Sequence, residues 1–367
     1  MAKASTSKKK PAAVVDPTVR VAQIDAELMS LIQERAELIV KTAPPRDSAS
    51  LTVCASGVEE HALAGLIEGS PGPLPRRSVR AVFRELMSGC RALVRDVRIA
   101  FLGPLYSYSH LAAIERFGRS VEFIPVGTIS AVFEEVNRRH SDFGLVPIEN
   151  STDGRIADTL DMFTRLPVRI CGEVEMQIHH TLLGKCPRNE IQEVYSRPQA
   201  LSQCRNWLAK HLPAARTIEV TSTSTAAQLA AEKPGAAAIA SLQAGVEYGL
   251  DVLAENIEDN PGNTTRFAVI GGHVAERTGK DRTAILFQME HRPGTLADAM
   301  NIFKRNKLNL TWIESFPMPG STRAYLFFAE MEGHQADARF GRAMAALKRR
   351  ALRLEILGSF PASAAVE

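Results

Sequence analysis

The sequence predicts a multidomain fold, in which an all-α module is followed by an α/β unit and then by an α+β domain of ferredoxin-like topology. Three observations support this prediction. The chain has 367 residues, enough for two or three domains of roughly 100–200 residues each. Apolar residues recur every three or four positions early in the chain, and fall in short strand-like runs from Val97 onward. The last part of the chain follows a βαββαβ order.

The all-α module contains two predicted helices. Apolar residues at helical spacing predict the first over 21–39 and the second over 78–94. Pro44 and Pro45 end the first helix, because proline lacks an amide proton and restricts the residue before it. The predicted boundaries are a disordered basic tail at 1–16, the all-α module at 17–96, the α/β unit at 97–272 and the α+β domain at 282–360.

The α/β unit is predicted from short apolar runs that alternate with helical patterns. VRIAFLG, FGLVPI and AAAIA read as strands, whereas ISAVFEEVNRR and PQALSQCRNWLAKHL read as helices. This alternation predicts a mostly parallel sheet, arranged as one large domain or as two small lobes. After the polar linker GGHVAERTGKD, TAILFQME is the first strand and TLADAMNIFKRN the first helix of the α+β domain.

The charge balance argues against nucleic acid as a partner. The chain has 44 basic and 41 acidic residues, and four lysines lie in the first ten positions, which leaves 40 basic against 41 acidic residues elsewhere. No basic domain is therefore present to bind phosphate backbones. The chain also lacks an apolar run of about 18 residues and a secretory signal, so we expect no membrane partner.

Cysteine usage predicts a cytoplasmic protein. The five cysteines are odd in number, widely spaced and without a C-x-x-C pair, which is typical of reduced thiols in a reducing compartment. They are Cys54, Cys90, Cys171, Cys186 and Cys204. Cys204 lies in a helical pattern, so we interpret it as a core residue rather than a nucleophile.

Polar clusters follow several predicted strands of the α/β unit, where open sheets bind ligands. The clusters are Ser107–His110, Glu149–Thr152, Ser196 with Gln199 and Gln203, and Asn263–Arg266. Helices that begin at Ser109, Pro198 and Thr223 would direct free N–H groups toward a small anion. The simpler alternative is that Ser109, Thr152 and Thr223 are helix N-caps and that Glu149 caps a helix near Asp153.

No metal site or organic cofactor is predicted. His179 and His180 are adjacent on an apparent strand, so their side chains point to opposite faces and cannot share a metal. The chain has no G-x-S-x-G or P-loop sequence, and GPLYSYS is too poor in glycine for a dinucleotide site.

Three long motifs, in order, resemble the prephenate dehydratase family. They are GLVPIENSTDGRIADTLDMF, EVYSRPQALSQCRNWL and AENIEDNPGNTTRFAVIG. The segment at 282–360 resembles the ACT regulatory domain of that family, and the N-terminal helices resemble its fused chorismate mutase domain. The resemblance implies a two-lobed catalytic domain of periplasmic-binding-protein type II-like fold. It also implies conversion of prephenate to phenylpyruvate, CO2 and water in L-phenylalanine biosynthesis, without a cofactor.

The resemblance also implies residue roles. Thr265 in the TRF motif would donate a proton to the departing hydroxyl, and Arg266 would hold a substrate carboxylate or steady its loop. The expected catalytic residues are Thr265, Glu149, Asn150, Ser196 and Gln203. The expected substrate-binding residues are Ser109, Ser151, Thr152, Gln199, Thr223, Ser224, Thr225, Arg266 and Phe267.

L-phenylalanine is the expected allosteric effector, bound across an interface between ACT domains of a homodimer or homotetramer. The expected effector-binding residues are Gly294, Thr295, Leu296, Asn309, Leu310, Glu314 and Ser315. Three positions depart from the family patterns: Tyr106 and Ser107 replace Gly-Thr in the first substrate loop, Arg197 replaces a histidine, and Phe316 replaces an arginine.

The mutase-like module departs furthest from its family. Asp25, Arg35 and Arg46 are the remnants of its charged site. Thr18 replaces an arginine, and Cys90 and Val94 replace polar residues, so electrostatic stabilisation of the transition state is expected to be weak. Two interpretations stay open for this module, a degenerate dimerising unit and an active mutase. For the α/β unit, the alternatives to prephenate dehydratase are arogenate dehydratase and a non-catalytic amino-acid-binding sensor.

Overall fold

The computed structural model describes residues 16–43, 63, 65–67, 69, 72–152, 154–317 and 325–363. Most of the predicted tail and Arg46 lie outside these residues. The last tail residue, Asp16, is the N-cap of the first helix, because its carboxylate accepts a hydrogen bond from the Thr18 amide at 2.8 Å.

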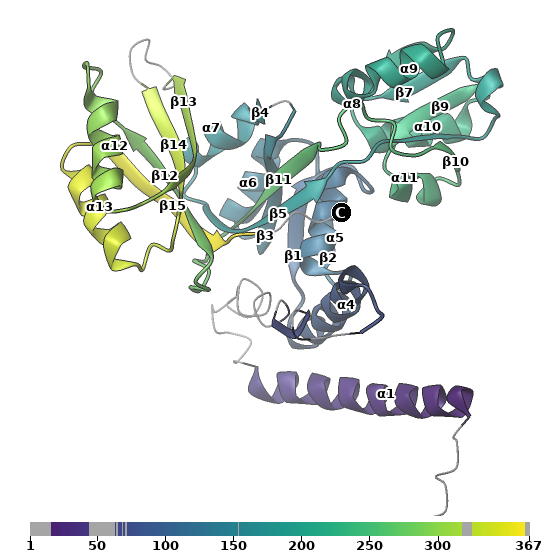
Figure 1. The fold of residues 1–367 in the computed structure, drawn as a ribbon, viewed down its shortest axis with the longest axis horizontal. Helices are drawn as coiled ribbons and strands as arrows, with labels where there is room; N and C mark the ends of the chain where they lie inside the picture. Colours follow the sequence, from purple (N-terminus) through teal and green to yellow (C-terminus); the bar gives the residue numbers. More distant parts are fainter. Residues whose placement is uncertain are drawn as a thin grey trace, which may run out of the picture.

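The N-terminal module is all-α, as predicted, and its two long helices differ in their surroundings. Helix α1 (Pro17–Thr42) has no buried residue and stands apart from the rest of the chain (Figure 1). Helix α4 (Arg76–Val94) packs against the next domain, where Arg91 donates to the Phe117 carbonyl at 2.7 Å. The helices touch where the Arg35 guanidinium lies 3.1 Å from Cys90 Sγ.

The first lobe of the α/β unit is built on a six-stranded sheet with the strand order β2-β1-β3-β11-β5, and with β4 beside β3. The strands are β1 (Arg98–Leu102), β2 (Glu122–Val126), β3 (Phe143–Asn150), β4 (Gly154–Arg155), β5 (Arg169–Gln177) and β11 (Thr264–Gly271). The helices are α5 (Tyr108–Phe117), α6 (Ile129–Asn137) and α7 (Ala157–Arg165). Strand β11 returns from the second lobe and runs antiparallel between β3 and β5.

The second lobe has a five-stranded sheet with the order β10-β6-β9-β7-β8, so the two-lobed prediction is confirmed. Its strands are β6 (Thr181–Gly184), β7 (Glu193–Ser196), β8 (Arg216–Glu219), β9 (Ala236–Ala240) and β10 (Asp251–Ala254). Its helices are α8 (Pro198–Gln203), α9 (Arg205–His211), α10 (Thr223–Glu232) and α11 (Leu242–Glu247), with a 3-10 turn η1 (Arg188–Glu190).

The single helix predicted over PQALSQCRNWLAKHL is two helices in the structure. Cys204 separates α8 from α9 with φ −113° and ψ 13°, and it is fully buried. Its thiol lies in the hydrophobic core of the second lobe, as predicted. Helix α11 was not predicted, because its six residues are too short to show a helical period.

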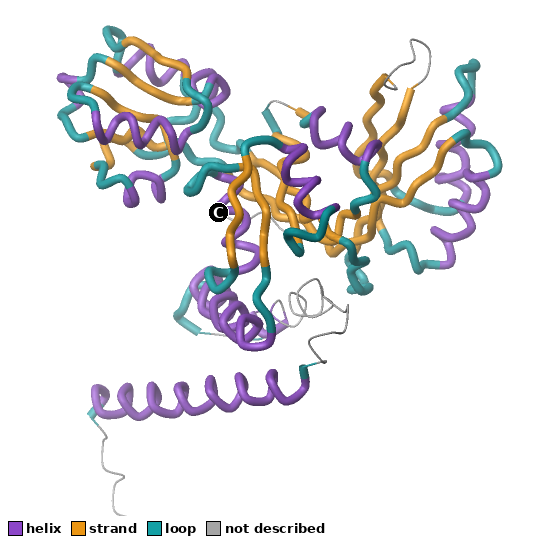
Figure 2. Tube along the Cα trace, turned by 180° about the vertical axis from the view of Figure 1, so that it is seen from behind, coloured by secondary structure: helices purple, strands orange, loops and turns teal. Residues whose placement is uncertain are grey.

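The C-terminal domain has the predicted ferredoxin-like topology, with an antiparallel sheet in the order β13-β14-β12-β15 (Figure 2). Its elements are β12 (Asp281–Gln288), α12 (Thr295–Arg305), β13 (Leu310–Pro317), β14 (Tyr325–Glu332), α13 (Ala338–Lys348) and β15 (Arg353–Pro361). The two helices cover one face of the sheet. The other face shares a hydrophobic core with the first lobe, in which Phe328 and Phe360 join Phe163.

Candidate active site

Strands β11 and β3 present two pairs of predicted site residues. Thr265 lies opposite Asn150 and Arg266 lies opposite Glu149. Successive side chains of a strand point to opposite faces of a sheet. The Thr265 and Asn150 pair therefore lies on one face, and the Arg266 and Glu149 pair lies on the other.

On the first face, Thr265 is held by hydrogen bonds. Asn150 Nδ2 donates to Thr265 Oγ1 at 2.8 Å and to Asn263 Oδ1 at 3.0 Å. Asn150 Oδ1 accepts from the Thr152 amide at 2.9 Å, which fixes the orientation of the Asn150 amide. Because Thr265 Oγ1 accepts from Asn150, its own proton is available for donation to a substrate oxygen.

The same network continues into the second lobe. Gln203 Oε1 accepts from Asn263 Nδ2 at 3.1 Å and lies 2.8 Å from His180 Nε2. His180 Nδ1 is 3.2 Å from the Tyr108 hydroxyl. These side chains meet where the chain crosses between the lobes, and Ile178 and Asn263 are joined there by a backbone hydrogen bond of 2.8 Å.

His180 and Tyr108 were not predicted as site residues. Sequence reasoning weighed His180 only as a metal ligand, and its partner Gln203 lies on a separate element of the second lobe. Burial lowers the pKa of His180, so the ring is neutral at physiological pH and serves as a hydrogen-bonding group. An adjacent histidine pair directly before a strand gives no signal of this role.

On the second face, Arg266 is surrounded by carboxylates. Its guanidinium lies 2.8 Å from Glu149, Glu173 and Glu330, and 5.7 Å from the ring centre of Trp312. Burial alone would lower the pKa of Arg266, but the charges of Glu330 and Glu173 outweigh it and raise the pKa. These contacts favour the second of the two predicted roles for Arg266, which is to steady its strand.

The remaining predicted residues of the second lobe mostly make structural hydrogen bonds. Ser196 Oγ donates to the Ile239 carbonyl at 2.7 Å and is fully buried. Ser224 Oγ donates to the Leu105 carbonyl of the first lobe at 2.7 Å, and Thr225 Oγ1 bonds Ser222 at 2.7 Å. Thr223 is the first residue of α10 and is buried, whereas Gln199 is exposed.

In the first lobe, four predicted residues have assigned positions. Ser151 Oγ accepts from the Thr264 amide at 2.9 Å, and Thr152 Oγ1 donates to Asn263 at 3.2 Å. Phe267 belongs to the hydrophobic core. Ser109 is buried on α5 but does not cap it, because Ser107 accepts from the His110 amide and is the N-cap.

The two other N-cap interpretations also fail. Thr223 lies inside α10, and Ser222 is its cap. Glu149 caps no helix, because β4 intervenes and α7 begins only at Ala157.

Tyr106 occupies the position where the family pattern has glycine. Its φ of 63° is a left-handed conformation that glycine adopts freely and other residues rarely do. Three contacts hold it there: the Tyr106 amide donates to His110 Nδ1 at 3.0 Å, its ring meets Tyr248 of the second lobe edge-on at 6.3 Å, and Ser241 Oγ donates to its carbonyl at 3.3 Å. The loop thereby joins the two lobes.

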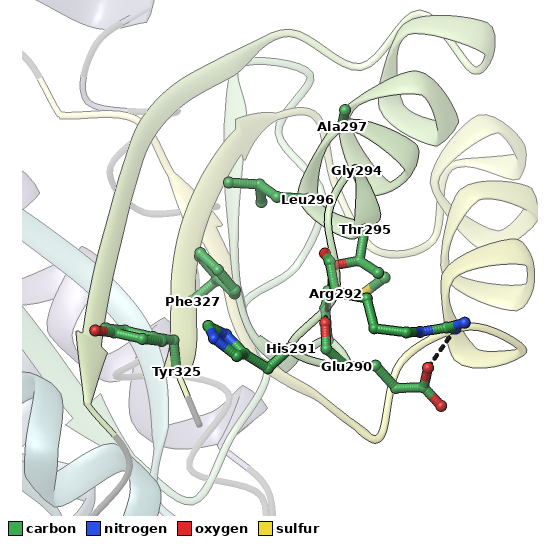
Figure 3. Close-up of a pocket in the computed structure, with 10 residues that line it drawn as sticks. Glu290, His291, Arg292, Gly294, Thr295, Leu296, Ala297, Tyr325 and Phe327 are labelled. Carbon is green, nitrogen blue, oxygen red and sulfur yellow. Dashed lines mark hydrogen bonds and ion pairs between the residues drawn. The ribbon is translucent and has the colours of Figure 1, made fainter. Parts of the chain in front are cut away.

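The C-terminal domain contains a separate cavity of about 310 Å³ (Figure 3). Gly294, Thr295 and Leu296 line it from the start of α12, and Tyr325 and Phe327 line it from β14. The other predicted effector residues lie elsewhere in this chain. Asn309 donates to Glu332, Leu310 packs in the domain core, and both Glu314 and the Ser315 carbonyl contact Arg155 of the first lobe.

Phe316 packs against the core shared with the first lobe, which explains why an apolar side chain is accommodated there.

The described residues contain no group of three or more His, Cys, Asp or Glu side chains that could hold a metal ion. Within the same residues, no helix has the length and apolar character needed to cross a membrane. Cys90, Cys171, Cys186 and Cys204 are free thiols.

Comparisons with known proteins agree with this geometry. Residues 99–275 match the family model of prephenate dehydratase, and residues 18–95 match that of chorismate mutase type II. A bifunctional chorismate mutase/prephenate dehydratase of Aquifex aeolicus is 38% identical over 92% of this chain and 95% of its own length. Arogenate dehydratase 2 of Petunia hybrida is 32% identical over 84% of this chain and 82% of its own.

A solved structure shows the same fold. The prephenate dehydratase of Arthrobacter aurescens, in complex with L-Phe, superposes with a TM-score of 0.69 and 32% identity. The match covers 72% of this chain and 90% of that one.

Proposed function

The chain belongs to the bifunctional chorismate mutase/prephenate dehydratase family and carries both enzyme domains, and we propose that Thr265 is the proton donor of its dehydratase site. Prephenate loses a ring hydroxyl and a carboxylate, and its ring becomes aromatic. Because aromatisation drives the reaction, the enzyme needs chiefly to protonate the departing hydroxyl and to orient the substrate. An enzyme of this family is a better account of the chain than a non-catalytic sensor.

The hydrogen bond from Asn150 to Thr265 carries this proposal. It occupies a lone pair of Thr265 Oγ1 and leaves the Thr265 proton to point toward a substrate. A threonine hydroxyl is a weak acid, so the donor group shares the developing negative charge with its neighbours. Asn150, Asn263 and Gln203 form the buried relay that does so.

The substrate carboxylates have a different partner from Arg266, whose charge is already matched by protein carboxylates. We assign one carboxylate to the N-terminus of α10, at Thr223 and Ser224. The first amides of a helix of ten residues are free to bind an anion, and the helix dipole favours negative charge there.

The mutase domain is assigned a weak activity. Arg35, one of its few cations, lies against Cys90 Sγ instead of a polar partner, and Asp25 is exposed. Stabilisation of a dianionic transition state needs several cations that converge on it. Incubation of the enzyme with chorismate, followed by quantification of prephenate and phenylpyruvate, measures this activity directly.

The assembly is proposed to be a homodimer or homotetramer in which α1 is covered by a second copy. Several large apolar side chains of α1 are about half exposed, including Val21, Leu28, Leu31 and Leu38. A helix with such a face is rarely stable alone in water. Light scattering at several concentrations measures the assembly, and a monomer at all of them would contradict it.

L-phenylalanine is the proposed effector, bound in the cavity of the C-terminal domain, which we interpret as an ACT domain. Leu296 and Phe327 offer an apolar wall, and Gly294, with φ 86°, opens the N-terminus of α12 for a carboxylate. Titration of the dehydratase with L-phenylalanine should lower its rate. The free thiols of the described cysteines support a cytoplasmic location.

One experiment tests the whole assignment. Purified protein is offered prephenate, arogenate and chorismate separately, and each product is identified. Phenylpyruvate from prephenate supports the proposal, whereas phenylalanine from arogenate alone would assign the chain to arogenate dehydratase. The second outcome has a specific basis, since one amine changes few contacts and a relative carries that name.

A further inference from the structure

The C-terminal domain contributes a buried carboxylate to the catalytic domain. Glu330 lies on β14, its side chain is only 1% exposed, and its Oε2 is 2.8 Å from Arg266 Nη2. Trp312 lies beside Glu330 in the β13–β14 register, and its ring faces the same guanidinium. Two residues that are distant in sequence from the TRF motif therefore hold the arginine of that motif.

The composition of this cluster is unusual for a contact that only stabilises a domain junction. Three carboxylates, Glu149, Glu173 and Glu330, surround two guanidinium groups, Arg266 and Arg282, so the cluster has one surplus negative charge. Burial raises the pKa of Glu330, and Arg266 only partly opposes this. Among the described residues, Glu330 Oε1 has no hydrogen-bond partner.

Buried ion pairs of this kind stabilise a fold poorly compared with apolar contacts, which are present beside it. Their contribution is a defined geometry. Arg266 is fixed from β3 by Glu149, from β5 by Glu173 and from the C-terminal domain by Glu330. Thr265 precedes Arg266 on the same strand, so the place of Arg266 determines where the Thr265 hydroxyl meets Asn150.

We propose that Glu330 is a positioning residue of the dehydratase site, which acts through Arg266 to hold Thr265 in its productive place. The inference rests on the proposed function of Thr265. Strand β14 also lines the cavity of the C-terminal domain with Tyr325 and Phe327. One strand thus contacts both the effector cavity and the arginine next to the proton donor.

The test compares Glu330→Gln with Glu355→Gln in the full-length chain. Glu355 lies on the neighbouring domain edge in β15, pairs with Arg353 at 2.7 Å and does not reach Arg266, so its substitution controls for a lost carboxylate in the same sheet. Glu330→Gln should lower kcat about 10-fold and leave KM within about two-fold, because a slightly misplaced donor slows the chemical step more than binding. Glu355→Gln should keep both constants.

A second arm separates positioning from a loss of folded protein. In a Thr265→Ala background the hydroxyl is gone, so Glu330→Gln should lower the residual rate no further. An equal loss in both backgrounds, or a kcat of Glu330→Gln like that of wild type, would overturn the inference. If Glu330→Gln does not fold, Trp312→Leu removes the other contact to Arg266 and should lower kcat in the same selective way; unchanged kcat would again overturn it.

The proposed function is judged separately, from wild type alone. A wild-type enzyme that forms no phenylpyruvate from prephenate would reject the dehydratase site and the inference together. An active wild type with a fully active Glu330→Gln rejects only the inference.

Discussion

The two faces of strand β11 differ in chemistry although they are formed by consecutive residues. Thr265 faces a network of neutral amides and a neutral histidine that reaches the second lobe. Arg266 faces three carboxylates and a tryptophan, two of which belong to the C-terminal domain. The neutral face can donate a proton without a competing charge. The charged face links the catalytic strand to the rest of the molecule.

The comparison separates residues that do chemistry from residues that set its geometry. A single TRF motif serves both purposes because the alternation of a strand sends neighbours to opposite sides. Changes on the neutral face should therefore alter the reaction and spare the fold. Changes on the charged face should alter the fold, or the position of the strand.

The largest effect is expected from Thr265→Ala. Loss of a positioned proton donor typically slows the chemical step about 10²–10⁴-fold, while KM should change little, because the hydroxyl assists mainly in the transition state. Steady-state kinetics with prephenate measure both constants. Thr265→Ser keeps a hydroxyl at the same place and should retain much of the rate, and near-wild-type turnover of the alanine variant would remove Thr265 from the mechanism.

The next effect is expected from Arg266→Met, on stability. The substitution leaves Glu173 and Glu330 buried without their main countercharge, which typically destabilises a protein by about 3–5 kcal/mol. Urea unfolding followed by the fluorescence of Trp312, with Trp207→Phe to silence the other tryptophan, measures the loss. Arg282→Met is the control: it removes only the contact with Glu173 and should cost clearly less. A smaller loss for Arg266→Met than for this control would contradict the difference between the faces.

The sequence predicted the architecture well and the charged face poorly. Periodicity and the order of strands and helices are local properties, so the three domains and the βαββαβ topology could be derived from them. The partners of Arg266 could not, because Glu330 is 64 residues away and on another domain. Motif matching identified Thr265 and Asn150 as site residues. Nothing local distinguishes Glu330 from any other acidic residue on a strand, or His180 from an ordinary core histidine.

A third prediction concerns the junction that holds the charged face in place. Strand β15 approaches β5 so closely that a Cβ on Gly358 would lie 1.9 Å from the Ile170 carbonyl oxygen. Gly358→Ala should therefore separate the domains locally and destabilise the chain by about 1–3 kcal/mol. Gly341→Ala on α13, where a Cβ meets nothing within 4 Å, should be neutral or slightly stabilising. The thermal midpoints of the two variants check the contrast, and equal midpoints would argue against a tight junction.

The smallest effect is the sharpest test of the contrast between the faces, because their titrating groups respond to pH in opposite directions. Burial raises the pKa of Glu330, so the folded state holds that proton more tightly than the unfolded state does. The contribution of Glu330 to stability is therefore complete below about pH 4.5 and falls as pH rises through its folded-state pKa. Glu330→Gln stays neutral, so its stability relative to wild type should increase with pH.

His180 should show the reverse slope. Burial lowers its pKa, so its contribution to stability is complete above about pH 6.5 and is lost as pH falls through its folded-state pKa. His180→Gln cannot titrate, and its stability relative to wild type should increase as pH falls. Thermal midpoints of both variants and wild type from pH 5 to pH 8 give the two slopes. Only their signs are needed, because a fixed loss of contacts shifts a curve without tilting it. Slopes of the same sign would mean that the neutral and charged faces are not electrostatically distinct.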